Sequence, residues 1–130
     1  MKKLKLKIKQ NSEHYRIIIN NRNTIIWAFT DLEKKVNDFA DLVTKTQVFY
    51  GQWVSYCAHG DDSLDSPQAV DFAAKIRLAF NEVFGAGMFD AIFGSRHPFE
   101  NEGDDFLMVA VYNKLATAVY KIWGKSFLNA

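Results

Sequence analysis

Hydrophobic and polar residues alternate at the start of the chain. Over residues 2–9, Leu4, Leu6 and Ile8 are separated by Lys, which is the period of a β-strand with one buried face. Two further runs rich in Ile, at 14–20 and 24–30, follow short polar stretches that suit turns. Asn residues between these runs tolerate the positive φ angles of tight turns. The pattern predicts an antiparallel β-meander over about residues 2–30.

Beyond the meander, hydrophobic residues recur every three or four positions, which is the period of an α-helix. The first helical stripe runs from Leu32 to Cys57, a long helix for a small domain. Thr30 and Glu33 have the spacing of a capping box, in which each side chain accepts the backbone N–H of the other residue. Gly51 interrupts the stripe, so a bend or a close approach is expected there.

The later helices have start and stop signals of their own. Ser66 followed by Pro67 predicts an N-cap and a first helical residue, and Gly85 predicts the end of that helix. Asp104 or Asp105 is expected to cap a final helix that ends before Gly124. The predicted helices cover about residues 31–58, 67–84 and 105–123, with a short helical turn at 88–93.

These elements predict a mostly α, α+β fold in which the meander packs on the helices. The chain has 130 residues, enough for one domain, with residues 1–30 and 31–130 as its two subregions. Hydrophobic residues make up 48% and charged residues 24%, as in globular proteins. Eleven Phe, five Tyr and three Trp are more than a small core usually needs. We expect some of this aromatic surface to face a partner.

Charge is unevenly distributed along the chain. Residues 1–30 contain seven basic residues and one acid, whereas the remainder contains nine basic residues and fourteen acids. Such a division suits an anionic partner, attraction within or between subunits, or simply a solvated strand face, and we favour the last. Alternate lysines repeat at about 6.8 Å, close to the phosphate spacing of one nucleic-acid strand. The candidate anion-binding residues are Lys3, Lys5, Lys7 and Lys9. Because no aromatic residues are interleaved with them for base stacking, nucleic-acid binding is the alternative hypothesis.

No pattern of residues predicts catalysis, a metal or a cofactor. The three His residues lie in different elements, without metal-ligand spacing, and each is expected at the surface. A calcium-loop-like start at Asp61 fails where Gly and Glu are required. The Gly85-x-Gly87 sequence follows a helix and lacks the third glycine of a dinucleotide site. Cys57 lies on the apolar stripe of the first helix, which suits a core residue. We therefore expect no enzyme activity.

The sequence also bears on location. A single Cys excludes an internal disulfide and is usual for reducing compartments. There is no apolar run of about 18 residues, so no transmembrane helix is expected. Lysines alternate with apolar residues at the start of the chain, which does not suit a signal peptide.

Residues 76–96 carry the most specific pattern. A helix ends in Phe-Gly-x-Gly, four residues follow, and then comes Ile-Phe-Gly-x-Arg before another helix. This order resembles the signature region of small bacteriophage and prophage tail assembly chaperones, over about residues 68–123. The matching positions are Phe84, Gly85, Gly87, Ile92, Phe93, Gly94 and Arg96. The sequence departs from that pattern at Ala86, where relatives often have an acid, and at Met88, where they often have a small residue.

The resemblance implies a non-enzymatic role in tail morphogenesis. Members of this family are thought to coat the tape measure protein, help deliver tail tube subunits, and leave before the tail is complete. The implied location is therefore the cytoplasm of the infected or lysogenic bacterial host, with the protein absent from the mature virion. We also expect self-association into a homo-oligomer. A structural component that stays in the tail is a further alternative.

The phenylalanines around the glycine corner are the expected partner contacts. The candidate partner-binding residues are Phe84, Phe89, Phe93, Phe99 and Arg96. Gly85, Gly87 and Gly94 are expected to form the turns that hold them.

Overall fold

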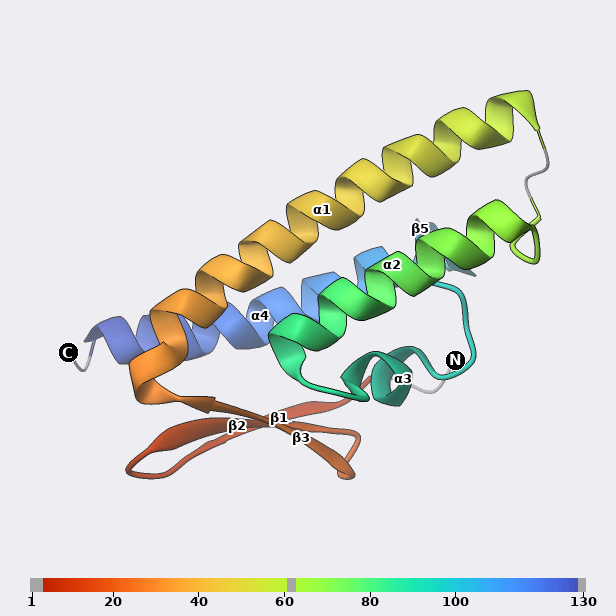
Figure 1. Ribbon diagram of the computed structural model, residues 1–130. Helices are drawn as coiled ribbons and strands as arrows, with labels where there is room; N and C mark the ends of the chain where they lie inside the picture. Colours follow the sequence, from red (N-terminus) through yellow and green to blue (C-terminus); the bar gives the residue numbers. More distant parts are fainter. Residues whose placement is uncertain (1–3, 61–62, 129–130) are drawn as a thin grey trace.

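The computed structural model describes residues 4–60 and 63–128 of the chain. A three-stranded sheet lies against a layer of long helices (Figure 1). In chain order the elements are β1 (Leu6–Gln10), β2 (His14–Ile19), β3 (Asn23–Ala28), the 3-10 turn η1 (Phe29–Asp31), α1 (Leu32–His59), α2 (Pro67–Phe84), α3 (Met88–Phe93), β4 (Asn101–Glu102), β5 (Asp105–Phe106) and α4 (Leu107–Leu128). The predicted α+β, mostly α class is confirmed.

The sheet is the predicted meander, with strand order β1-β2-β3 and antiparallel pairing throughout. Asn11 shapes the first turn, because its side-chain oxygen accepts the backbone N–H groups of Glu13 and His14 at 2.8 and 2.9 Å. Asn20 and Asn21 form the second turn with φ of 51° and 61°, which Asn tolerates better than most residues. The first described strand begins at Leu6, and Lys2 and Lys3 lie outside the described residues.

Strand register determines which side chains face the helices. Ile8 pairs with Ile17, which pairs with Ile25, and this row lies on the inner face. Lys9 pairs with Arg16, which pairs with Ile26, and this row faces away from the helices. Because successive side chains point to opposite faces of a strand, the sheet has one apolar face and one basic face.

The long helix α1 lies where it was predicted, but its N-terminal cap differs from the prediction. Its N-cap is Asp31, with no side-chain hydrogen bond to the cap, so the expected capping box of Thr30 and Glu33 does not form. The chain leaves β3 directly through the 3-10 turn, and that turn occupies Thr30. At Gly51 nothing described lies within 4 Å of where a Cβ would be, apart from its chain neighbours and the backbone of its own helix, so the close approach considered there is not found.

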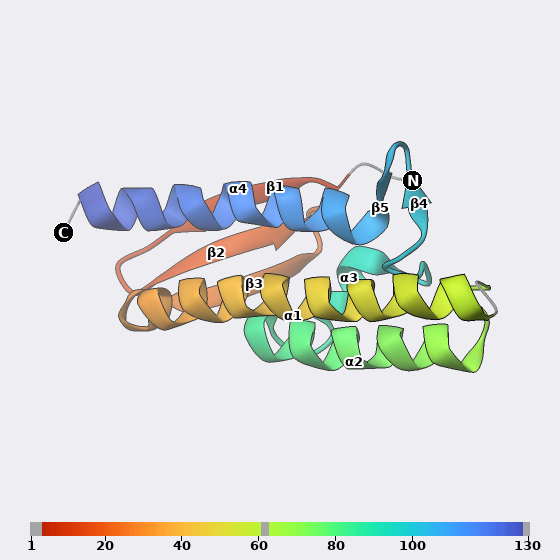
Figure 2. The same cartoon turned by 90° about the horizontal axis from the view of Figure 1, so that it is seen from above.

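The helices α2 and α4 run antiparallel to α1 and lie beside it (Figures 1 and 2). The predicted start of α2 is confirmed, because Ser66 accepts the backbone N–H of Ala69 at 3.2 Å and Pro67 is the first helical residue. The predicted start of α4 is wrong. Asp105 pairs with Glu102 across a short hairpin, so the helix begins at Leu107, and it continues through Gly124 to Leu128.

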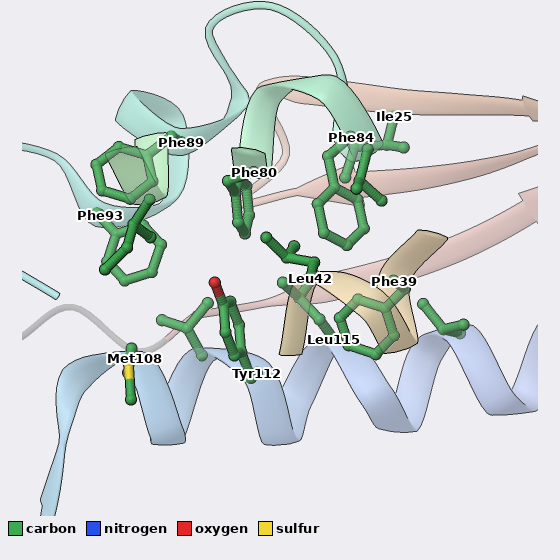
Figure 3. Packing of buried hydrophobic residues seen from close by; sticks show 14 of the residues in the cluster. Ile25, Phe39, Leu42, Phe80, Phe84, Phe89, Phe93, Met108, Tyr112 and Leu115 are labelled. Atoms are coloured by element: carbon green, nitrogen blue, oxygen red, sulfur yellow. The ribbon is translucent and has the colours of Figure 1, made fainter. Parts of the chain in front are cut away.

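An aromatic cluster fills the space between sheet and helices. Phe80 of α2 is fully buried at its centre (Figure 3). Its ring lies 4.7 Å from Phe84, 5.8 Å from Phe89 and Phe93, and 6.2 Å from Tyr112, measured between ring centroids. The aromatic surplus noted in the composition therefore lies largely in the core. The buried aromatic residues are Tyr15, Trp27, Phe39, Trp53, Phe72, Phe80, Phe84, Phe89, Phe93, Phe99 and Tyr112.

Candidate partner-binding surfaces

Two bends flank α3, and glycines form both. Gly85 and Gly87 have φ of 116° and 80°, and Gly94 has φ of 62°, angles at which any side chain beyond hydrogen is strained. Asn81 holds the first bend: its backbone oxygen accepts the N–H of Gly85 at 2.8 Å, and its side-chain oxygen accepts the N–H of Phe89 at 2.9 Å. The structure thus places the three expected turn glycines at the turns.

The four phenylalanines expected to contact a partner are all buried. Phe84 is 4% exposed, and Phe89, Phe93 and Phe99 are each 2% exposed. Phe84 stacks on Trp27 of the sheet, and Phe89 and Phe93 stack on each other with centroids 4.4 Å apart. The reason is that the glycine corner folds α3 back against α2, which turns these rings inward. The exposed aromatic patch expected around the corner is therefore not found.

Arg96 is engaged within the chain. Its guanidinium forms ion pairs with Glu100 and, at 2.6 Å, with Glu102, and it donates to the backbone oxygen of Asn101 at 3.2 Å. The hydrogen bond from Arg96 lowers the pKa of Glu102, and its two carboxylate partners raise the pKa of Arg96. Arg96 thus anchors the β4–β5 hairpin to the end of α3.

That hairpin forms one wall of an aromatic hollow of about 540 Å³. Trp53 of α1 and Phe99 are among its lining residues, are almost fully buried, and stack at 6.1 Å with an interplanar angle of 23°. Phe106 of β5 is half-buried, and its ring lies 5.0 Å from that of Tyr50. The full lining is Trp53, Cys57, Leu64, Phe99, Glu100, Asn101 and Phe106. Glu100 and Asn101 contribute polar groups beside the aromatic and aliphatic side chains, and a hollow of this mixed lining can accept an apolar side chain that has polar neighbours.

Of these lining residues, Phe99 alone is among the candidate partner-binding residues named from the sequence. Trp53 and Cys57 were recognisable, because they lie one turn apart on the apolar stripe of α1. Leu64 lies in the connection before α2 and carries no periodic signal. Phe106 could be placed only with the hairpin, which the sequence did not predict.

His97 supports the same region and is not the surface residue expected. Its Nδ1 accepts the backbone N–H of Phe99 at 3.1 Å, so Nε2 carries the proton and donates to the backbone oxygen of Ala69 at 2.7 Å. The ring therefore links the start of α2 to the segment that carries Phe99. This role is structural.

The outer face of the sheet is basic. Lys5, Lys7 and Lys9 are exposed there, and Arg16 lies directly opposite Lys9. Within residues 4–60 and 63–128, none of these four side chains forms an ion pair. The candidate residue Lys3 lies outside the described residues.

Titratable groups do not assemble into a metal site. Over the part of the chain that the structure describes, no three His, Cys, Asp or Glu residues lie close enough together to hold an ion. The most strongly perturbed phenol is Tyr112, whose pKa is raised by burial and whose hydroxyl lies 2.9 Å from Oγ1 of Thr46. This pair lies between α1 and α4 in the core.

Comparisons with known proteins return no match: no family model, no curated protein and no solved structure is similar to this chain. Among the described helices, none combines the length and the apolar character needed to cross a membrane.

Proposed function

We propose that this chain is a non-enzymatic tail assembly chaperone, which binds the tape measure protein and tail tube subunits while a bacteriophage tail is built. The motivating pattern is the sequence from Phe84 to Arg96, which resembles the signature region of that family. Two features of the fold support the proposal: glycines with positive φ form the turns of the corner, and Arg96 anchors the hairpin that follows.

The observation that carries the proposal is the aromatic hollow between Trp53, Phe99 and Phe106. Arg96 connects it to the corner, since its ion pairs with Glu100 and Glu102 position the segment that bears both phenylalanines. Of the signature residues, Arg96 thus acts indirectly: it positions lining residues of the hollow and does not itself contact the client.

The hollow suits weak and reversible binding. Burying one Leu or Phe side chain of a client contributes about 1.5–3 kcal/mol, less than a stable complex needs. Several such contacts along a long apolar client, or several copies of this chain, supply the remainder. Weak individual contacts also allow the chaperone to leave, as the family role requires.

Co-expression with the tape measure protein of the same phage tests the proposal. We expect the soluble fraction of the tape measure protein to rise and the two proteins to co-purify. Phe106→Ser should reduce both effects, because it makes one wall of the hollow polar. Tyr120→Ser, at an exposed aromatic position of α4 away from the hollow, is the matched control and should reduce neither. Unchanged solubility together with no co-purification contradicts the proposal.

Self-association and location are parts of the same proposal. Sedimentation velocity of the purified chain should show species larger than a monomer. Mass spectrometry of purified virions should not detect the chain, whereas a structural tail component would be found there.

Nucleic-acid binding remains the second candidate, because the basic residues on the outer face of the sheet lack acidic partners in the described part of the chain. An electrophoretic shift titration at two salt concentrations tests it. Salt-sensitive binding that disappears when Lys3, Lys5, Lys7 and Lys9 become Ser favours this function. Binding that survives those substitutions contradicts it.

A further inference from the structure

β1 is an edge strand, and its backbone shows which groups point away from the sheet. The N–H of Asn20 donates to the backbone oxygen of Lys5 at 2.9 Å, and at the other end the N–H of Asn11 donates to that of His14 at 3.1 Å. In an antiparallel pair the residues that exchange backbone hydrogen bonds alternate along the strand. The backbone groups of Lys5, Lys7 and Lys9 therefore point toward the neighbouring chain segment that includes β2. The backbone groups of Leu4, Leu6 and Ile8 therefore point to the free edge.

A hydrogen bond from α4 confirms this direction. Nζ of Lys114 donates to the backbone oxygen of Leu4 at 2.8 Å, from the side opposite β2. Within residues 4–60 and 63–128, the outward N–H and C=O groups of Leu6 and Ile8 have no hydrogen-bond partner. Unpaired strand edges of this kind accept another strand.

An apolar groove of about 290 Å³ lies beside the free edge. The inward side chains of β1 form one wall, and two of them, Leu6 and Ile8, are only half-buried. The exposed face of α4 forms the other wall. The lining residues are Leu4, Leu6, Ile8, Lys114, Thr117, Ala118 and Lys121.

Positive charge surrounds this groove on both sides. Lys114 and Lys121 line it, Lys7 and Lys9 project from the opposite face of β1, and no acidic residue is among its lining residues. A second copy of β1 would place lysines beside lysines, which is destabilising. The same lysines attract a strand that carries carboxylates.

We propose that the free edge of β1 binds an extended, acidic segment of a partner protein, which adds a fourth antiparallel strand to the sheet. Its apolar residues alternate with acidic residues. The apolar side chains enter the groove beside Leu6 and Ile8, and the acidic side chains lie on the lysine face. This inference does not depend on the chaperone function proposed above, because its site lies at β1 and α4 and shares no lining residue with the aromatic hollow.

The inference can be tested with a synthetic peptide and the full chain. The probe is Glu-Val-Glu-Val-Glu-Val-Glu-amide with fluorescein on its N-terminal amine, and its binding is measured by fluorescence anisotropy. Residues directly opposite one another share a face, so the valines are the residues that exchange hydrogen bonds with Leu6 and Ile8. N-methylation of the valines should weaken binding by about tenfold or more, the effect of losing two hydrogen bonds. N-methylation of glutamates in the middle of the peptide, whose N–H groups point to solvent, is the matched control and should leave affinity nearly unchanged.

Hydrogen exchange of the unmodified protein gives a second readout. Saturation with the peptide should slow exchange of the Leu6 and Ile8 amides and leave those of Lys7 and Lys9, already bonded to β2, almost unchanged. The proposal is overturned if valine N-methylation leaves the affinity of the peptide unchanged, or if exchange slows equally at all four amides. No saturable binding of the peptide also overturns it.

A charge variant completes the test. Lys114→Gln combined with Lys121→Gln should weaken peptide binding by about tenfold, because it removes the two cations that line the groove. A peptide with Lys in place of Glu should bind the natural chain more weakly still. Equal affinity for the acidic and basic peptides contradicts the proposed chemistry.

Discussion

The outer face of the sheet and the corner around α3 direct their side chains in opposite ways. On β1 the lysines reach solvent and form no ion pair within the described residues. Around α3 the phenylalanines all point to the core and contact one another. The comparison teaches that the two regions contribute differently to stability: substitutions at the corner should destabilise the chain strongly, and substitutions on the lysine face should leave its stability almost unchanged.

Phe80→Ala should have the largest effect. Phe80 is fully buried and contacts rings from α2, α3 and α4, so its removal should lower the free energy of unfolding by about 3–5 kcal/mol. Urea denaturation followed by circular dichroism measures the change. Leu78→Ala on the same helix, at a side chain 66% exposed, is the control and should change stability little. Similar losses for the two variants would show that the corner is not the centre of the core.

Gly94→Ala and Gly51→Ala should have opposite signs. Gly94 has φ of 62°, so Ala there should cost about 1–2 kcal/mol through backbone strain. Gly51 lies within α1 with open space around it, so Ala there should stabilise the chain by up to about 1 kcal/mol. Thermal unfolding of both variants gives the comparison. A loss of stability at both positions would contradict this account of α1.

Tyr112→Phe should change the dependence of stability on pH. Burial raises the pKa of the Tyr112 phenol above its ordinary 10.0, so between that value and the raised pKa the unfolded chain ionises and the folded chain does not. Tyr112 therefore makes the folded state less stable as pH rises above 10. The variant lacks the hydrogen bond to Thr46, so its free energy of unfolding near neutral pH should be about 1 kcal/mol lower. Its free energy of unfolding should, however, decrease less steeply as pH rises above 10. Urea midpoints at about pH 8 and about pH 11 measure this, and equal falls in both proteins would contradict it.

Changing Lys5, Lys7 and Lys9 together to Ser should have the smallest effect on stability, within about 0.5 kcal/mol. The loss of Lys9 even relieves a like-charge pair with Arg16 directly opposite it. Urea denaturation checks the value. A decrease in the free energy of unfolding as large as that of Phe80→Ala would mean that these lysines make contacts that stabilise the fold.

Much of the fold could be predicted because its signals are local. Alternation with period two places Leu6 and Ile8 on one face of a strand whatever follows, and Ser66 with Pro67 specifies a helix start within one turn. The errors lie where distant or competing contacts decide. Thr30 has the right neighbours for a capping box, but the exit from β3 takes it into a 3-10 turn. Asp105 has the right type for a cap, but Gly103, with φ of 63°, turns it back to pair with Glu102.

Among the candidate sites, too, those that depend on local sequence could be predicted and those that depend on distant contacts could not. The lysine face follows from strand period alone and could be predicted. The burial of Phe84, Phe89 and Phe93 could not be predicted, because it depends on the direction in which the glycines on either side of α3 bend the chain. The aromatic hollow needs Trp53 of α1, Leu64 of the connection before α2 and Phe106 of β5, and no periodic pattern links them.

The bond between Lys114 and Leu4 joins residues 110 positions apart, which has a consequence for how the chain is made. A ribosome adds about 5–20 residues per second, so Lys114 is synthesised on the order of ten seconds after Leu4, whose backbone oxygen it hydrogen-bonds. During that interval the newborn sheet has neither α4 across its apolar face nor a cap on its edge. The alternating lysines of β1 are then the main barrier to pairing between neighbouring nascent chains on one messenger RNA.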